Sequence, residues 1–383
     1  MKAATIEFLR QRFSEYYRTA PLIAPPSVEQ REWAFVLFDP GFPGIRMRRH
    51  IGYPGKDPLF EYIRSVAPAH LYYSSAYYGL PHAPTMGEKE WLGADLIFDL
   101  DADHIVRGPY EVMLDRVKEE TGKLIGMLTA ELGFADREIE LVFSGGRGYH
   151  VHIRDVAVRG WGSSERREIV DYICGIGLDP GIILSIPSPS PRGWHQRYIA
   201  ALTEYLLWLE GRDEKEALAD LMAHEGVGKV TAEEFLKRAP GLRAALRDDP
   251  ASINLRDFAT GKVIRALSSA TEGMFTGLLR ERAALADEPV TTDTKRLIRM
   301  PSSLHGGSGF RVTPVRLRDL PDFDPLTDAV VFGTRPVKVT CVRPVTMTLC
   351  GSSYPCDAGP NTVPEALAVF LCCRGLAEAG GGG

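Results

Sequence analysis

Residues 91–104 read WLGADLIFDLDADH, and this stretch predicts the strand around which the fold is built. Phe98 and Leu100 are apolar and alternate with other residues, which is typical of a strand with one buried face. Because successive side chains of a strand point to opposite faces, Asp99 and Asp101 share the other face. Two carboxylates about 6.5 Å apart at Cα can converge on metal ions spaced about 3.5–4 Å apart. The stretch therefore predicts a divalent-metal site.

The Asp-x-Asp pattern also has two less specific interpretations. An EF-hand calcium loop needs Gly at its sixth position and Glu at its twelfth, where this chain has His104 and Tyr110. The calcium loop is therefore excluded. The two carboxylates can instead face solvent at the end of a sheet, and the short pattern alone leaves that alternative open. Other motifs of the chain have to distinguish a metal site from a solvent-facing acidic pair.

The composition is that of an ordinary globular protein. Of 383 residues, 44% are hydrophobic and 25% charged, which suits one large domain with an insertion or two smaller domains. A net charge of -5 gives no overall basic field, so nucleic acid would bind at local patches such as Arg46, Arg48, Arg49 and His50. That cluster is equally compatible with a solvated rim. No run of about 18 apolar residues and no secretory N-terminus occur, so we expect a cytoplasmic protein without membrane contact.

Secondary-structure patterns change twice along the chain. Up to residue 190, helical and strand patterns alternate, with strands expected at 33–38, 139–143 and 149–153 and helices at 5–19, 57–66, 110–132 and 164–174. After a Ser/Pro-rich linker at 187–191, residues 191–286 are charged and helix-forming. Strand and loop character returns at 287–360. In the segment 361–383, Thr362 and Glu365 have capping-box spacing and predict a last helix, followed by a disordered Gly tail.

The loop Ser-Gly-Gly-Arg-Gly at 144–148 lies between two predicted strands. Its glycines let the backbone approach a ligand and turn N–H groups toward an anion, and Arg147 adds a cation. His150 follows on the next strand and can present a ring N–H to the same anion. These groups would suit a nucleotide triphosphate. Taken alone, an ordinary Gly-rich hairpin explains the loop equally well.

A third group of charged residues lies between 287 and 309. Asp287 is followed by Arg296 and Arg299 on a predicted strand that ends at a proline, and then by His305. Such a strand can place Arg299 and His305 beside bound phosphates. By itself this segment is only a charged strand and loop.

The three pieces together resemble the catalytic, small subunit of the archaeal and eukaryotic type of DNA primase. The resemblance runs through FDLDAD at 98–103, SGGRGYH at 144–150 and DEPVTTDTKRLIRMPSSLHG at 287–306, and it extends to REWAF at 31–35. The order and separations are those of the family, and nearly the whole chain is covered. The details of SGGRGYH and RLIRMPSSLHG favour the archaeal branch.

The resemblance implies an α+β (mixed α/β) fold. The expected catalytic core consists of mixed sheets flanked by helices, and its two parts are residues 1–190 and 287–360. Residues 191–286 would be a helical insertion into this core, and 361–383 the C-terminal helix and tail.

The resemblance also implies roles for individual residues. The catalytic, metal-binding aspartates would be Asp99, Asp101 and Asp287, the last approaching from a neighbouring strand. The nucleotide-binding residues would be Ser144, Arg147, His150, Arg299 and His305. The activity implied is two-metal nucleotidyl transfer with Mg²⁺ or Mn²⁺, which makes short primers on single-stranded DNA from nucleoside triphosphates during replication.

The sequence departs from the family pattern in two places. Family members commonly carry a Cys/His zinc knuckle after the acidic pair, but no cysteine lies between Asp101 and Ser144, so we predict no structural zinc. Gly307 stands where some members have a lysine, so one phosphate contact is missing from the pattern.

Small subunits of this family act in a heterodimer with a large subunit, which we expect here. A primase-fold polymerase of end joining and a two-metal nuclease are the alternatives, while the three aspartates argue against a non-catalytic subunit.

Overall fold

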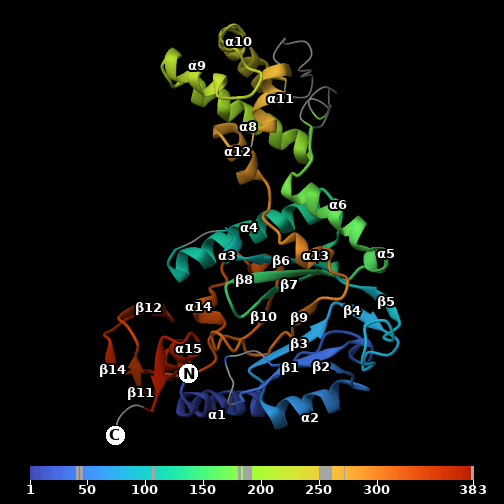
Figure 1. Cartoon of the computed structure of the whole chain (residues 1–383), viewed down its shortest axis with the longest axis vertical. Coiled ribbons are helices and arrows are strands. Elements are labelled where there is room, and N and C mark those ends of the chain that lie inside the picture. Colours follow the sequence, from blue (N-terminus) through green and yellow to red (C-terminus); the bar gives the residue numbers. More distant parts are fainter. Residues whose placement is uncertain are drawn as a thin grey trace. The chain divides into compact units, whose positions relative to one another are not determined.

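A computed structural model describes residues 1–39, 43, 46–105, 108–179, 183, 192–249, 261–270 and 272–380 (Figure 1). The chain is a mixed α+β protein, which confirms the predicted fold class. It divides into two compact units. The sheet unit contains Met1–Gly122, Phe134–Arg167 and Asp287–Gly383, and the helical unit contains Lys123–Gly133 and Glu168–Ala286. The predicted linker at 187–191 lies outside the described residues, as does all of the glycine tail after Gly380.

The first sheet of the sheet unit is antiparallel and has the strand order β2-β1-β3-β9. Trp33 and Phe35 of the central strand β1 are fully buried. Figure 1 shows the helices α1 and α2 beneath this sheet, where Phe13 and Leu59 contribute buried apolar side chains. The bounds are α1 Ala3–Thr19, β1 Trp33–Val36, β2 Met47–Ile51, α2 Lys56–Val66, β3 His70–Ser74 and β9 Leu297–Arg299.

The second sheet contains the acidic strand and has the order β10-β7-β8-β6. In its register Asp99 of β6 lies opposite His150 of β8, and Asp101 lies opposite Gly148. Phe98 and Leu100 are fully buried on the other face, as the two-residue alternation predicts. The bounds are β6 Leu96–Asp101, α3 Ala102–Ile105, α4 Tyr110–Ala130, β7 Ile139–Phe143, β8 Gly148–Ile153, α5 Val156–Arg159, α6 Ser163–Cys174, α13 Glu288–Thr292 and β10 Thr313–Val315.

The quoted stretch 91–104 contains two strands rather than one. Residues 91–94 form β5, which pairs with β4, and β6 begins two residues later. Asp95 lies between the strands and is fully buried, where its carboxylate binds the Arg31 guanidinium at 2.8 Å. This ion pair separates the two strands and fixes the start of β6. The bounds are β4 Ala76–Tyr78 and β5 Trp91–Ala94.

The C-terminal segment adds a three-stranded sheet, β14-β11-β15, and the hairpin β12-β13. Here the predicted capping box is wrong, because Thr362 pairs with Lys338 inside β14 and Pro364 occupies the N-cap of α15. Glu365 instead binds Arg12 at 2.8 Å. The bounds are α14 Pro325–Asp328, β11 Pro336–Cys341, β12 Val345–Leu349, β13 Ser352–Cys356, β14 Gly359–Pro364, α15 Glu365–Cys373 and β15 Ala377–Ala379.

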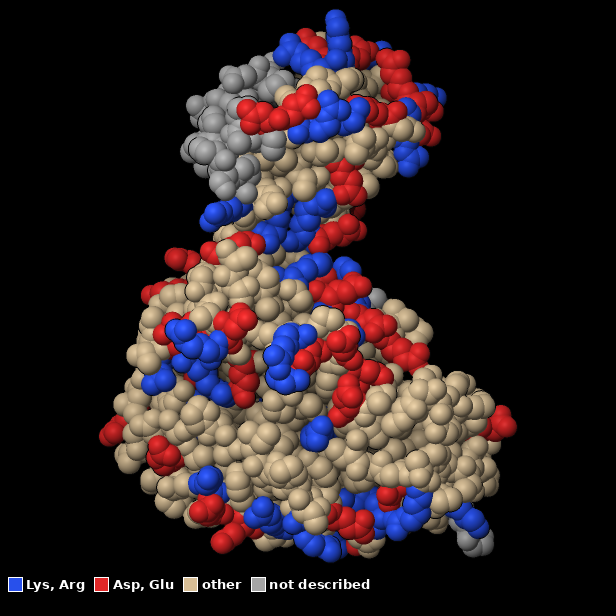
Figure 2. Space-filling view, turned by 180° about the vertical axis from the view of Figure 1, so that it is seen from behind, with Lys and Arg blue, Asp and Glu red and all other residues tan. Residues whose placement is uncertain are grey.

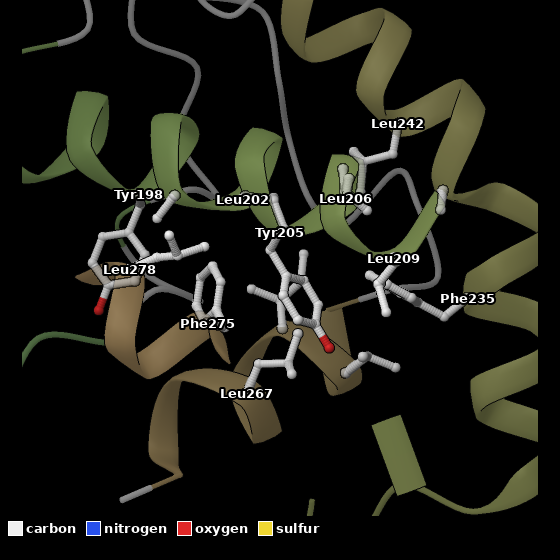
Figure 3. Close-up of a cluster of buried hydrophobic side chains, with 14 of the residues drawn as sticks. Tyr198, Leu202, Tyr205, Leu206, Leu209, Phe235, Leu242, Leu267, Phe275 and Leu278 are labelled. Carbon is white, nitrogen blue, oxygen red and sulfur yellow. The ribbon is translucent and has the colours of Figure 1, made fainter. Parts of the chain in front are cut away.

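The helical unit has its own apolar core, in agreement with the helix-forming composition of this segment. Tyr205 and Phe275 lie at the centre of that core, with ring centroids 5.6 Å apart (Figure 3). The Tyr205 hydroxyl donates a hydrogen bond to Asp220 at 2.6 Å, which satisfies its one polar group. The bounds are α8 Gly193–Glu210, α9 Glu214–Met222, α10 Lys229–Asp248, α11 Gly261–Ser269 and α12 Met274–Arg282.

On the face drawn in Figure 2, basic and acidic side chains are intermingled, which agrees with the small net charge. Within the described part of the chain, no helix combines the length and the apolar character that crossing a bilayer requires.

Candidate active site

A polar cavity of about 290 Å³ lies in the sheet unit and contains seven of the eight residues predicted for the site. These seven are Asp99, Asp101, Ser144, Arg147, His150, Arg299 and His305. The eighth, Asp287, does not line the cavity itself. Strands from both four-stranded sheets of the unit supply the wall, so segments distant in sequence meet at one place.

The two aspartates of β6 form the acidic side of the cavity. The side chain of Asp99 is only 21% exposed, and its Oδ1 lies 3.7 Å from the Nε2 of His150. Burial, followed by the charges of Asp101 and Asp287, raises the pKa of Asp99 to about 7. Like charges near a carboxyl group favour its neutral form.

Asp287 joins this acidic side through the backbone. Its N–H donates a hydrogen bond to the carbonyl oxygen of Asp99 at 2.9 Å. The prediction that Asp287 approaches on a strand is wrong, because the residue is the N-cap of the short helix α13. Pro289 lies in the first turn of this helix, where a missing N–H costs nothing. The carboxylate of Asp287 accepts no capping hydrogen bond from the N-terminus of α13.

The donor chemistry of the acidic side fits a hard divalent cation. Carboxylate oxygens are the preferred ligands of Mg²⁺ and Mn²⁺. Burial, followed by the charges of Asp101 and Asp287, makes the Asp99 carboxylate costly, and a bound cation would offset that cost. Among the described residues, no group of three or more His, Cys, Asp or Glu side chains already has the spacing of a metal site.

Replacing Asp99 with Asn is expected to stabilise the metal-free protein at pH 8. A raised carboxyl pKa means that the folded state holds a proton which the unfolded state has lost, so the free energy of unfolding falls as pH rises from about 4 to about 7. Asn carries no charge and avoids this loss. We expect a gain of about 2 kcal/mol or more at pH 8, which shrinks toward pH 5. Denaturant unfolding in the presence of a chelator measures it, and equal stability of both proteins at pH 8 would contradict the assigned environment.

The loop 144–148 lines the cavity next to β6, where Gly148 pairs with Asp101, and its glycines are required by close contacts. Gly145 has a φ of +75°, and a Cβ there would lie 2.8 Å from the Cβ of His305. A Cβ on Gly148 would collide with the carbonyl oxygen of Leu100 in the neighbouring strand. The Tyr110 hydroxyl donates a hydrogen bond to the carbonyl oxygen of Gly146 at 2.5 Å, which fixes the middle of the loop. The loop is thus a tightly packed turn against β6 and His305.

Two neutral histidines face this loop. The N–H of Gly307 donates to Nδ1 of His305 at 3.1 Å, so the ring proton of neutral His305 is on Nε2. A Cβ on Gly146 would lie 3.2 Å from that Nε2, which places the donor beside the loop. Burial lowers the pKa of His305 well below its usual value and that of His150 to about 3. Both rings therefore act as neutral hydrogen-bond donors near neutral pH.

Four arginines line the cavity, and sequence reasoning assigned only two of them. Arg147 and Arg299 were predicted, whereas Arg296 was noted without a role and Arg374 was missed. Arg374 caps the C-terminus of α15, and its guanidinium carbon lies 5.7 Å from the centroid of the Tyr110 ring. No motif or spacing links residue 374 to the other pieces. Only the packing of the C-terminal helix brings it to the cavity.

The basic cluster around β2 is only partly a surface patch. The Arg49 guanidinium binds the buried carboxylate of Glu32 at 3.0 Å, so this residue has a structural partner. Arg46 and Arg48 are exposed. A nucleic-acid contact at this cluster stays a prediction.

Comparison with known proteins gives the same family as the motifs. The model of the DNA primase small subunit family matches residues 98–317. The DNA primase small subunit PriS of Methanoregula boonei is 59% identical over 381 residues, covering 99% of this chain and 100% of the relative. The proteins of the same name from Methanospirillum hungatei and Methanosphaerula palustris are 53% and 52% identical, covering 100% and 99% of this chain and 98% and 99% of their own lengths. This chain belongs to the DNA primase small subunit family, and its relatives here are archaeal.

Proposed function

We propose that this chain is the catalytic subunit of a DNA primase and makes short primers on single-stranded DNA from nucleoside triphosphates. The observation that carries the proposal is one cavity lined both by Asp99 and Asp101 and by the neighbouring 144–148 loop, together with Arg147 and Arg299. Nucleotidyl transfer needs both: carboxylates for divalent metal, and donors for a triphosphate.

Asp99, Asp101 and Asp287 would hold Mg²⁺ or Mn²⁺. When bound, these ions would lower the pKa of the attacking 3′ hydroxyl and neutralise charge on the triphosphate. The burial of Asp99 supports a strong preference of this site for a cation, because the charge of the Asp99 carboxylate is costly when no cation is bound. We propose no structural zinc after the acidic pair.

The chain's own groups would bind and orient the triphosphate. The loop glycines leave room for phosphate oxygens, and Arg147 and Arg299 supply positive charge. The Nε2–H of His305 donates a hydrogen bond without adding charge. Groups that stabilise developing negative charge in this way typically contribute about 10²–10³ in rate each.

The partners that we propose are single-stranded DNA and a large primase subunit. The relatives are named small subunits, which supports a second, larger subunit in the assembly. Binding of DNA should weaken strongly with salt, because phosphate contacts release counterions.

One assay separates the proposed activity from its rivals. The chain is incubated with labelled nucleotides, single-stranded DNA and Mn²⁺, with and without an oligonucleotide primer and with and without the large subunit. New oligonucleotides formed from free nucleotides support a primase. Extension only of a supplied primer favours an end-joining type of polymerase, and a shortened template favours a nuclease.

Replacing Arg374 with Ala is expected to raise the KM for nucleotide by roughly fivefold to tenfold while kcat stays within about threefold. The residue is exposed and lines the cavity, so it should add positive charge for the nucleotide at a solvated position. Arg343→Ala, at an exposed arginine that does not line the cavity, is the matched control. An unchanged KM in Arg374→Ala would remove this residue from the binding site.

A further inference from the structure

His70 lies directly against the two basic residues of the third motif. It is the first residue of β3 and is only 8% exposed. The Arg299 guanidinium donates a hydrogen bond to His70 Nδ1 at 2.6 Å, and the N–H of Gly306 approaches the same atom at 3.3 Å. The His70 ring also meets the His305 ring edge-on, with centroids 5.2 Å apart. One imidazole thus contacts the Arg299 side chain, the His305 ring and the backbone between His305 and Gly307.

The contacts determine the charge state of this ring. A guanidinium and a backbone N–H can only donate, so Nδ1 accepts and the ring proton is on Nε2. Burial and the charge of Arg299 lower the pKa of His70 to about 3. His70 is therefore neutral at physiological pH, and it holds the Arg299 guanidinium without neutralising the positive charge of that group.

Two other buried or half-buried arginines of the sheet unit are held differently. Arg31 binds Asp95 at 2.8 Å and Arg154 binds Glu140 at 2.5 Å, so a carboxylate compensates each charge. In the part of the chain that the structure describes, no carboxylate oxygen lies within 4.0 Å of the Arg299 guanidinium. Its other close neighbour is the ring of Tyr72, whose centroid lies 4.9 Å away. Asp99 and Asp101 act on Arg299 only through longer-range attraction.

We propose that His70 is a positioning residue, which fixes the Arg299 guanidinium through a neutral hydrogen bond and leaves its positive charge for the triphosphate. This inference rests on the proposed function, because it requires an anionic substrate in the cavity. A carboxylate at position 70 would hold Arg299 as firmly, but it would form an ion pair and compete with the phosphates. Nucleotide affinity should therefore depend on the charge of the side chain at position 70. The ability of that side chain to accept a hydrogen bond should not be sufficient.

The test compares His70→Gln with His70→Glu in the full chain. Gln keeps a neutral acceptor, and Glu keeps an acceptor but adds a negative charge. Binding of ATP and of inorganic triphosphate is measured by calorimetry, with thermal unfolding as the check on folding. We expect His70→Glu to weaken both ligands by roughly tenfold or more and His70→Gln by less than about threefold. The same two changes at His82, an exposed histidine outside the cavity, are the control and should leave both affinities unchanged.

Arg299→Gln provides an independent arm. If His70 acts through Arg299, adding His70→Glu to Arg299→Gln should reduce affinity much less than it does in the wild type. The inference is overturned if His70→Glu binds both anions as tightly as the wild type, if Gln and Glu cause equal losses, or if the loss persists in full without Arg299.

Measuring anion binding also distinguishes a failure of this inference from a failure of the proposed function. A wild-type chain that binds inorganic triphosphate but makes no oligonucleotide with its large subunit contradicts the proposed function, while the Gln and Glu comparison still decides the role of His70. A wild-type chain that binds neither anion overturns both.

Discussion

Asp101→Asn is expected to reduce nucleotide incorporation at least about 10³-fold, with the thermal stability of the chain nearly unchanged. Asp101 shares a face of β6 with Asp99 and lines the cavity beside Gly148 of the glycine loop, with which it pairs. Asn keeps the size of the side chain but removes a negatively charged metal ligand. Primer synthesis with Mn²⁺ measures the effect.

The matched control for this change is Asp115→Asn, at an exposed aspartate on α4 that does not line the cavity. It should retain wild-type activity. Asp101→Asn with more than about a tenth of wild-type synthesis would remove this carboxylate from the catalytic site.

The largest loss of stability is expected for Asp95→Ala, by about 3–5 kcal/mol. Arg31 and Asp95 are both fully buried and 2.8 Å apart, and the Tyr77 hydroxyl donates to the same carboxylate at 2.7 Å. Removing Asp95 leaves the Arg31 charge buried without its carboxylate partner, since its remaining hydrogen bonds go to the neutral backbone oxygens of residues 26, 74 and 75. Denaturant unfolding measures the change.

An exposed ion pair supplies the comparison. Glu7→Ala breaks the pair with Arg10 on α1, whose two side chains are 46% and 56% exposed. Such pairs contribute little, so the expected loss is below about 0.5 kcal/mol. Similar losses for Asp95→Ala and Glu7→Ala would show that the buried pair does not stabilise the start of β6.

Local sequence patterns predicted the parts of the site that depend on local geometry. The alternation around Asp99 and Asp101 follows from the two-residue period of a strand. The glycines of the 144–148 loop mark a turn in which a side chain would collide with its neighbours. These features need only a few consecutive residues, so a short window of sequence contains them.

Features that depend on packing between distant segments were not predictable in the same way. Asp287 begins a helix and its backbone N–H bonds to β6, and no pattern around residue 287 shows that partner. Thr362 has the spacing of a capping box, but pairing with β11 takes it into a strand. Arg374 reaches the cavity through the packing of α15, and His70 contacts Arg299 because β3 pairs with β9. Each depends on a contact across many residues.

The central claim is that Asp287 completes one metal site with Asp99 and Asp101. The most direct test is titration of the metal-free chain with Mn²⁺, followed by electron paramagnetic resonance of the free ion, in the wild type and in Asp287→Asn. We predict that the wild type binds Mn²⁺ and that Asp287→Asn lowers this affinity at least about tenfold. Equal Mn²⁺ affinity in the two proteins would contradict the claim.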